Sequence, residues 1–493
     1  MKATFLPEPE LEFGTGRHVD IRFGLVNHGP LDLDHPTAPR RIRVGVVGTS
    51  ETVEGVVAWL ERCREAIPAR VSRRPHLFPG FPGCAPDVGL RTAIVLDPRA
   101  QRSIPQRRFD ALAGRAGAEA VVTEAVALFL DEVRYLAEET QVDVIICAVP
   151  AAYLDAMEEH DPGAMPAAAR GASGVARAVT AREEAPIARP DFHDLLKARA
   201  LPLGKPIQLV LPPTYDPTKR RRQVARPERE RRTQDEATRA WNFHTALYYK
   251  AGGTPWRIAR DPHAYTACYV GVSFYRTTDG DELHTSVAQV FDKRGEGIVV
   301  RGGTARLAKE DRKPHLDAAG AERLLTDALA RYRAEHRTQP ARVVLHKSSR
   351  FDADELAGFT AAAERQGIDL VDLVSLGNAH TRLFRDGAYP PLRGTFLSLD
   401  AVNHVLYTRG SVDFYATYPG MYVPRPLLLR RERAESTPEF LAREILALSK
   451  MNWNSTQFDG DEPITLAAAR KVSAILRYTE AGQVIAPRYS FYM

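Results

Sequence analysis

Residues 142–149 (VDVIICAV) decide the fold class, because they form an almost unbroken apolar run. Such a run is typical of a strand that is buried on both faces of a parallel sheet. Before it, residues 119–139 carry apolar side chains three or four positions apart, which predicts an amphipathic helix. A strand over 43–47 and a helix over 52–64 come earlier. This alternation predicts an α/β fold.

The same pattern continues after the apolar run, with less regular sequence in between. Residues 155–204 show weak periodicity and are expected to be irregular or made of helical fragments. A strand over 207–211 ends at two prolines, and a helix over 234–250 ends at the pair Gly252 and Gly253.

The second half of the chain has a different order of elements. Strands joined around a TTDGDE turn come first, and helices then alternate with strands, which is the order of an RNase H-like fold. The expected elements are strands 267–276, 284–291 and 298–301, helix 321–337, strand 342–346, helix 354–366 and strand 368–374. We therefore expect a turn-rich arm over 1–40, one domain over 41–262 and a second over 263–493.

Composition narrows the class of protein. The chain has 493 residues, 44% of them apolar, which is enough for several domains with their own cores. Its four cysteines form no CxxC pair, which excludes a disulfide scaffold and a cysteine zinc site. No signal peptide and no run of about 18 apolar residues is visible. We expect a cytoplasmic protein that does not contact a membrane.

Positive charge is concentrated in one segment. Residues 219–232 (KRRRQVARPERERR) hold eight basic and two acidic residues, a local charge of +6, whereas the whole chain carries +5. The rest of the chain therefore sums to −1. A segment with this balance favours a polyanionic partner such as nucleic acid. The alternative is a solvated loop whose charges bind nothing specific.

Polar residues gather around this basic segment. Tyr215 and Lys219 would lie on one face of a single helical turn, and Gln234 and Lys250 follow it. Ammonium, amide and phenol groups offer the donors that a terminal phosphate needs, and a tyrosine ring can stack on a base. A half-buried tyrosine and a surface lysine are the alternative interpretation of the same pattern.

Longer motifs in this region resemble a known family. TYDPTK (214–219) and TQDEATRAWNFHTALYYKAGGTPWR (233–257) are similar to the guide 5′-phosphate pocket of the Argonaute MID domain. MNWNSTQFDGDEPIT (451–465) resembles the closing segment of PIWI domains, and residues 8–32 resemble the start of short prokaryotic Argonautes. The resemblance implies a Rossmann-like MID domain followed by an RNase H-like PIWI domain.

The resemblance also assigns roles to the polar residues. Tyr215 would stack under the first base of the guide, and Lys219, Gln234 and Lys250 would hold its 5′-phosphate. Gln223 is the alternative for the amide role. In relatives the C-terminal carboxylate, here that of Met493, completes the pocket with a Mg²⁺ ion, and Gln234 would also serve this ion.

The expected cutting site of the PIWI domain departs from the family. Slicing Argonautes hold two Mg²⁺ ions with carboxylates, but Ser273 and Ser348 stand at the first two of these positions. Lys347 lies beside the second, where its ammonium would repel a cation. The remaining ligand position falls near Ala469 or Arg470, and the acidic residues of the TTDGDE turn have no common centre. We therefore expect no nuclease activity.

The resemblance implies a function in prokaryotic immunity. A short guide RNA would direct binding to a single-stranded DNA target from plasmids or phage. An APAZ-containing partner with a TIR, sirtuin-like or nuclease domain would act as the effector in abortive infection, and the complex could assemble into higher oligomers on activation. Two alternatives remain open. One is an active endonuclease with misaligned carboxylates, and the other is an NAD-binding enzyme built on the turn at 44–50 (VGVVGTS).

Overall fold

The apolar run that decides the fold class forms strand β6 (Val144–Ala148), in which all five side chains are buried. It pairs in parallel with β4 (Arg41–Gly48) and with β7 (Ile207–Val210). Strand β5 (Ala93–Ser103) completes a four-stranded sheet of order β5-β4-β6-β7, in which every pairing is parallel. The predicted α/β class is confirmed.

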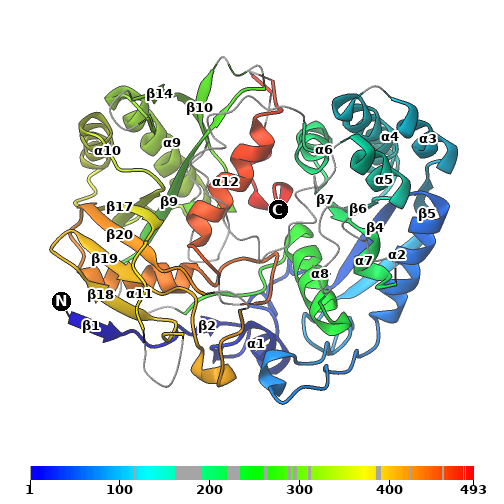
Figure 1. The fold of residues 1–493 in the computed structure, drawn as a ribbon, viewed down its shortest axis with the longest axis horizontal. Coiled ribbons are helices and arrows are strands. Elements are labelled where there is room, and N and C mark those ends of the chain that lie inside the picture. Colours follow the sequence, from blue (N-terminus) through cyan, green and yellow to red (C-terminus); the bar gives the residue numbers. More distant parts are fainter. Residues whose placement is uncertain are drawn as a thin grey trace.

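Helices cover both faces of this sheet. Helices α2 (Ser50–Arg62) and α8 (Glu236–Lys250) pack on one face. Helices α4 (Ala118–Glu139), α5 (Ala151–His160) and α6 (Phe192–Ala200) pack on the other. These elements form the right-hand lobe of the molecule (Figure 1). Where it is described, the segment expected to be irregular or made of helical fragments contributes helix α6 and the end of helix α5.

Local signals explain where two of these helices begin and end. The Thr49 side chain accepts a hydrogen bond from the Thr52 amide and so caps α2. At Gly48 a Cβ would lie 2.8 Å from the Ala148 carbonyl oxygen, so this glycine permits close packing. Helix α8 is capped by Asp235 and is followed by Gly252 at φ 93°, as the glycine pair predicts.

The second lobe is built on a mixed sheet of eleven strands. Its order is β1-β18-β19-β20-β17-β16-β9-β10-β13, and β11 and β12 pair beside β9. Only the pairs of β16 with β9 and with β17 are parallel. The bounds are β1 (Lys2–Phe5), β9 (Ala267–Arg276), β10 (Leu283–Ser286), β11 (Val290–Phe291), β12 (Gly297–Ile298), β13 (Arg301–Thr304), β16 (Arg342–Lys347), β17 (Leu370–Asn378), β18 (Thr395–Ser398), β19 (Asn403–Leu406) and β20 (Leu427–Arg433).

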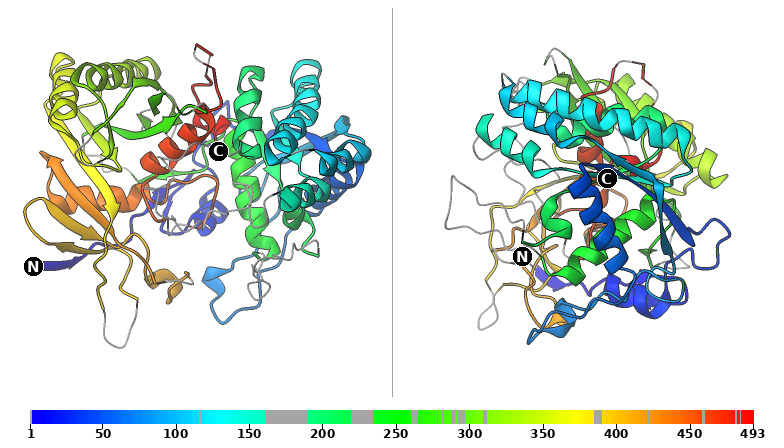
Figure 2. Two further views of the ribbon diagram at one scale, coloured as in Figure 1. Left: turned by 45° about the horizontal axis from the view of Figure 1, so that its top comes forward. Right: turned by 90° about the vertical axis from the view of Figure 1, so that its right-hand side faces the viewer.

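Helices again lie on both faces of this sheet. Helices α9 (Ala318–His336) and α10 (Ala353–Arg365) pack against each other beside β9, β13 and β17. Helices α11 (Pro438–Leu448) and α12 (Ile464–Leu476) lie on the opposite face (Figures 1 and 2). The strands-first order with later helix–strand alternation agrees with the predicted RNase H-like architecture.

The N-terminal segment joins the eleven-stranded sheet and also forms a small three-stranded sheet of its own with β8. Strand β1 pairs with β18, and β2 (Leu11–Glu12) lies between β3 (Arg17–His18) and β8 (Arg257–Ile258). Helix α1 (Ile21–His28) follows; the sequence pattern alone did not indicate it.

One buried contact also ties this segment to the second lobe. The Glu8 carboxylate pairs with Arg393 at 2.9 Å and with Lys450 at 3.1 Å. Both of these cations are buried, so the segment predicted as an arm packs on the chain's own lobes.

The structure describes the chain except for residues 1, 116, 161–189, 219–233, 260–264, 279, 281, 287–289, 292–296, 309–311, 385–389, 421–422, 458–459, 481 and 484. The two lobes share one hydrophobic core, which runs from α2 and α8 to α9 and α12. Trp256 and Trp453 anchor this junction through indole hydrogen bonds to backbone carbonyls across it. Within the described residues, no helix is long and apolar enough to cross a membrane.

Candidate functional site

Three lysines converge around β7, the edge strand of the four-stranded sheet. Lys197 comes from α6 on one face of the sheet and Lys250 from the last turn of α8 on the other. Lys471 comes from α12 of the second lobe, which packs against α6. Helices from both lobes, α6 and α12, thus lie beside β7 (Figure 1).

Lys250 is buried, and its ammonium donates a hydrogen bond to the side-chain carbonyl of Gln208 on β7. Burial and the nearby charge of Lys471 lower its pKa from 10.5 to about 7. The amide oxygen that it contacts carries no charge. No acidic side chain among the described residues forms a direct ion pair with Lys250.

Lys197 is buried more deeply, with 1% of its surface exposed. Its Nζ atom has no hydrogen-bond partner among the described residues. Burial lowers its pKa well below 10.5, and the ammoniums of Lys250 and Lys471 lower it further. Asp194 and Cys147 oppose this shift more weakly.

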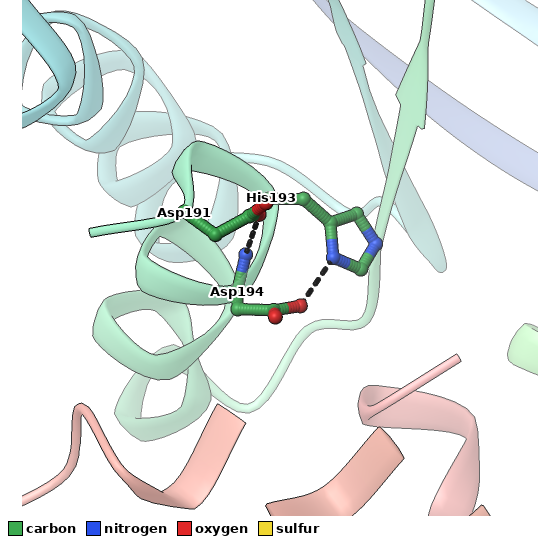
Figure 3. A group of neighbouring side chains, drawn as sticks. All are labelled: Asp191, His193 and Asp194. Atoms are coloured by element: carbon green, nitrogen blue, oxygen red, sulfur yellow. Dashed lines mark hydrogen bonds and ion pairs between the residues drawn. The ribbon is translucent and has the colours of Figure 1, made fainter. Parts of the chain in front are cut away.

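The acidic group nearest to this cluster is already engaged. The ring Nδ1 of His193 lies 2.7 Å from Oδ1 of Asp194, as Figure 3 shows. Burial lowers the pKa of His193 to about 4, so the ring is neutral at pH 7 and donates to the carboxylate. Burial alone would raise the pKa of Asp194. The hydrogen bond from His193 and the charges of the neighbouring lysines have the opposite effect and are stronger, so the pKa is lowered. Asp194 is thus the acidic side chain that acts on Lys197.

The C-terminus lies at the same junction. In both ribbon views it sits between α12 and the helices α6 and α8 (Figures 1 and 2). Met493 is buried, and the last turn η7 (Tyr489–Phe491) contacts α8. This position agrees with the role that the family resemblance assigns to the terminal carboxylate.

Tyr215 and Gln234, which were also expected in the pocket, lie at the opposite end of α8. Helix α7 (Pro212–Tyr215) ends at Tyr215, near the first turn of α8, where Arg239 donates to the Thr214 carbonyl at 2.9 Å. The 15 residues of α8 extend about 22 Å between that turn and Lys250. The structure therefore does not bring Tyr215 beside Lys250.

The surroundings of Tyr215 are those of a packed side chain. Its ring lies against α2, where a Cβ added to Gly55 would be 2.6 Å from the ring. Its hydroxyl is buried without a hydrogen-bond partner in the described part of the chain. Burial raises its pKa to about 12. Lys219, Gln223 and the basic run 219–232 lie outside the described residues, so the predicted four-residue cluster stays a prediction.

Gln234 binds within the first lobe instead of facing the C-terminus. Its side-chain oxygen accepts a hydrogen bond from Asn242 at 3.2 Å, and Asn242 in turn accepts from the amide of Thr456. The structure therefore does not bring the Gln234 side chain and the Met493 carboxylate together at one site. The predicted Mg²⁺ ion at the Met493 carboxylate therefore stays a prediction.

Ser273 and Ser348 lie on the same face of the second sheet, as their assigned roles require. Lys347 pairs with Val272 in the parallel register of β16 and β9, so the next residues along are Ser348 and Ser273. Side chains alternate between faces along a strand. His346 bonds to Thr465 of α12 at 2.9 Å, so the two serines face α12 as well.

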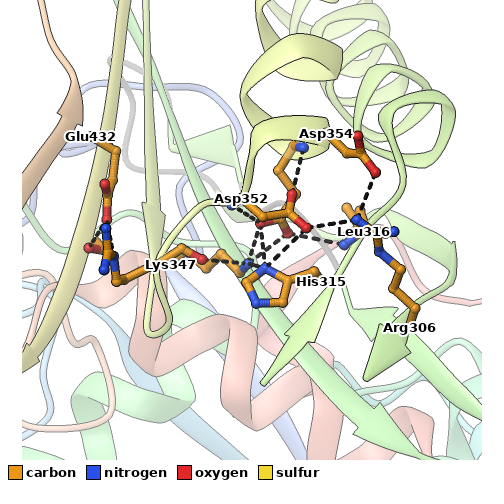
Figure 4. A network of polar contacts seen from close by, with 10 residues as sticks. Arg306, His315, Leu316, Lys347, Asp352, Asp354 and Glu432 are labelled. Carbon is orange, nitrogen blue, oxygen red and sulfur yellow. Dashed lines mark hydrogen bonds and ion pairs between the residues drawn. The ribbon is translucent and has the colours of Figure 1, made fainter. Parts of the chain in front are cut away.

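Lys347 lies on the other face, which corrects the expectation that its ammonium would repel a cation at these serines. Its Nζ atom lies 2.6 Å from Glu355 of α10, and both side chains are fully buried. His315 and Asp352 join this network, which Figure 4 shows. The physical reason is the two-residue period of the strand, which sends neighbouring side chains to opposite faces.

No cluster of ligands replaces the missing carboxylates on the α12 face of the described structure. Two groups of histidines and carboxylates lie close enough to hold an ion, but they belong to α6 and to the Lys347 network. Arg470 of α12 forms an ion pair with Glu462. Glu282 of the TTDGDE turn bonds to His284 at 2.8 Å, and Asp279 and Asp281 lie outside the described residues.

The sequence analysis missed Lys197 and Lys471 of the lysine cluster, and it also missed Gln208, which accepts a hydrogen bond from Lys250. Lys197 and Lys471 lie far from the recognised motifs, and Gln208 sits inside a strand pattern. A lysine at a buried position of α6 was the available signal, but residues 155–204 have too little periodicity to reveal which positions are buried.

Comparisons with known proteins support the fold. No family model matches the chain. Protein argonaute of Aquifex aeolicus (strain VF5) is 24% identical over 229 residues, covering 46% of this chain and 29% of that protein. Clostridium butyricum Argonaute bound to a guide DNA and a 19-mer target DNA matches with a TM-score of 0.67 and 16% identity. Drosophila Piwi matches with a TM-score of 0.57 and 13% identity.

These solved structures are longer proteins. The matches cover 99% of this chain but 54% of the Clostridium butyricum chain and 56% of the Drosophila chain. This chain therefore spans about half the length of the structures that it resembles. Its two lobes, with a parallel α/β sheet and an RNase H-like sheet in this order, make it an Argonaute/PIWI-like protein in fold.

Proposed function

We propose that this chain is the guide-binding and target-recognising subunit of a prokaryotic defence system. It would bind a short guide RNA with a 5′-phosphate and use base pairing to find a complementary single-stranded DNA. The observation that carries this proposal is the convergence of Lys197, Lys250 and Lys471 at the edge of β7. Once protonated, these lysines would outnumber Asp194, the acidic side chain beside them, and would donate charge-assisted hydrogen bonds to a phosphate.

The location of this excess supports a chain terminus as the ligand. Lys197 and Lys250 are buried, and they lie with Lys471 where the two lobes meet, close to the C-terminus, a location that favours the end of a nucleic-acid chain over its continuous backbone. The basic run 219–232 would add longer-range attraction for the rest of the guide and for its target.

We propose that the chain does not cut its target. By the family resemblance, Ser273 and Ser348 stand at the positions of two metal ligands, and a serine hydroxyl cannot neutralise a divalent cation. Arg470, near the remaining ligand position, adds a positive charge that is already paired with Glu462.

A subunit that recognises a target without cutting it needs an effector. We propose a partner that contains an APAZ region fused to a TIR, sirtuin-like or nuclease domain. Target binding would activate the partner against plasmids or phage. On activation, the complex would assemble into higher oligomers. The N-terminal segment is tied to both lobes, so the outer faces of the second lobe leave more surface for the partner than residues 1–40 do.

The first test is to purify the chain and to sequence the nucleic acid that accompanies it, with and without the neighbouring gene product. Short RNAs with 5′-phosphates are the expected result. In binding assays, the double variant Lys219→Ala with Lys250→Ala should lose much more affinity for a 5′-phosphorylated guide than for the same guide with a 5′-hydroxyl. Equal losses for both guides would mean that these lysines only add charge.

A further inference from the structure

The structure assigns Lys197 a role that the family motifs do not include. We propose that Lys197 of α6 is a ligand of the guide's terminal phosphate, and that it gains a proton when the phosphate enters. This inference rests on the proposed function, because it deepens the description of the same site. The ligand is a phosphate monoester at the end of a nucleic acid.

The geometry singles out Lys197 among the buried lysines. Its Nζ atom is buried and has no hydrogen-bond partner among the described residues. In contrast, Lys347 is paired with Glu355, and Lys450 with Glu8. A lysine that only stabilises the fold would be expected to have such a partner, because an isolated buried ammonium is costly.

The charged and titratable groups that influence Lys197 come from four elements. They are Lys250 from α8, Lys471 from α12, Cys147 from β6 and Asp194 from α6 itself. Asp194 is engaged by His193 at 2.7 Å, and the Cys147 thiol is neutral at pH 7, because burial raises its pKa to about 12. Burial, the lack of a hydrogen-bond partner among the described residues and the charges of Lys250 and Lys471 therefore all disfavour the ammonium form of Lys197.

A phosphate dianion would reverse this balance. It would place two negative charges among the three lysines and favour the ammonium form of Lys197. The proton moves from solvent to Nζ, and no covalent bond forms or breaks. The resulting ammonium donates charge-assisted hydrogen bonds to phosphate oxygens, which are among the stronger hydrogen bonds in proteins.

The test is Lys197→Met, which keeps the length of the side chain and removes the amine. Binding of one RNA sequence with a 5′-phosphate or a 5′-hydroxyl is measured by fluorescence anisotropy. Lys205→Met is the matched control, because Lys205 follows α6 closely and donates to the Val142 carbonyl at 2.8 Å, outside the cluster. We expect Lys197→Met to reduce the preference for the 5′-phosphate by about tenfold or more, and the control to preserve it.

Calorimetry in two buffers of different ionisation enthalpy counts the protons taken up on binding at pH 8. The unmodified chain should take up more protons with the 5′-phosphate guide than Lys197→Met does. An unchanged preference together with unchanged proton uptake in Lys197→Met would overturn the assignment. If the unmodified chain itself shows no 5′-phosphate preference, the proposed function fails instead.

Thermal unfolding without guide separates binding from folding. Because Lys197 lacks a partner, Lys197→Met should leave the guide-free Tm unchanged or raise it. A large fall in the guide-free Tm would show a structural role for Lys197 and would contradict the proposal.

Discussion

The Nζ atom of Lys347 lies 2.6 Å from the carboxylate of Glu355, on the face of the second sheet opposite to Ser273 and Ser348. Glu355 also accepts hydrogen bonds from the amides of Leu316 and Asp352. The ion pair therefore links the end of β16 to the start of α10. Its role is structural, and the missing carboxylates alone account for the expected lack of cutting.

Lys347→Met should destabilise the fold by about 3–5 kcal/mol, because it leaves the Glu355 carboxylate buried without its counter-charge. Urea unfolding measures this loss. Arg306→Met is a suitable control, since the pairs of Arg306 with Asp352 and Asp354 are exposed and should contribute at most about 1 kcal/mol. If both variants lose equally little stability, the network around Glu355 does not hold the fold together. Guide binding should be unchanged in both.

Ser273→Asp combined with Ser348→Asp should not create a nuclease. The two new carboxylates would lie side by side facing α12, but the next ligand position is occupied by Ala469 or Arg470. Two carboxylates without the remaining ligands do not fix a two-metal site. Cleavage of a labelled target with Mg²⁺ or Mn²⁺ is the measurement. Target cutting by this double variant would show that the site had been misjudged.

The main helices and strands could be predicted because each of them carries a signal in its own local sequence. The apolar run of β6, the periodicity of α4 and the glycine stop after α8 depend on neighbouring residues, so they can be read without knowledge of the tertiary structure. Helix α1 and the pairing of β1 with β18 had no such signal, because β1 joins a strand about 390 residues later.

The candidate site could be predicted only in part for the same reason. Lys250 ends a strongly periodic helix and belongs to a recognisable motif. Lys197 and Lys471 reach the same edge of β7 from other helices. Lys197 lies more than 50 residues before Lys250 in the sequence, and Lys471 lies more than 220 residues after it. Their shared position depends on how the lobes pack, which no local pattern encodes.

Chelation of divalent cations tests the predicted Mg²⁺. Since three lysines supply positive charge beside the C-terminus, EDTA should weaken 5′-phosphate guide binding less than Lys250→Met does. The same anisotropy titration with and without EDTA gives both values. A larger loss with EDTA would mean that an ion, held by the Met493 carboxylate and the guide, carries most of the charge. A 5′-hydroxyl guide serves as the control for general salt effects.

The lowered pKa of Lys250 predicts an unusual pH dependence of stability. In the folded chain its pKa is about 7, compared with 10.5 for a free lysine. Between these values the unfolded chain holds a proton that the folded chain lacks, so the free energy of unfolding should rise with pH. The contribution of one such group is at most about 1.4 kcal/mol per pH unit. Below pH 7 both states are protonated and this contribution no longer changes with pH.

Lys250→Met isolates this effect, because it removes the titrating group and leaves the other charges in place. Urea unfolding of both proteins at several pH values from 6 to 9.5 should show a difference in slope that appears only above about pH 7. Lys205→Met should keep the slope of the unmodified chain. Saturating 5′-phosphate guide should flatten the rise, because the bound phosphate favours the ammonium form in the folded state. Parallel curves for the unmodified chain and Lys250→Met would show that Lys250 stays protonated throughout this range.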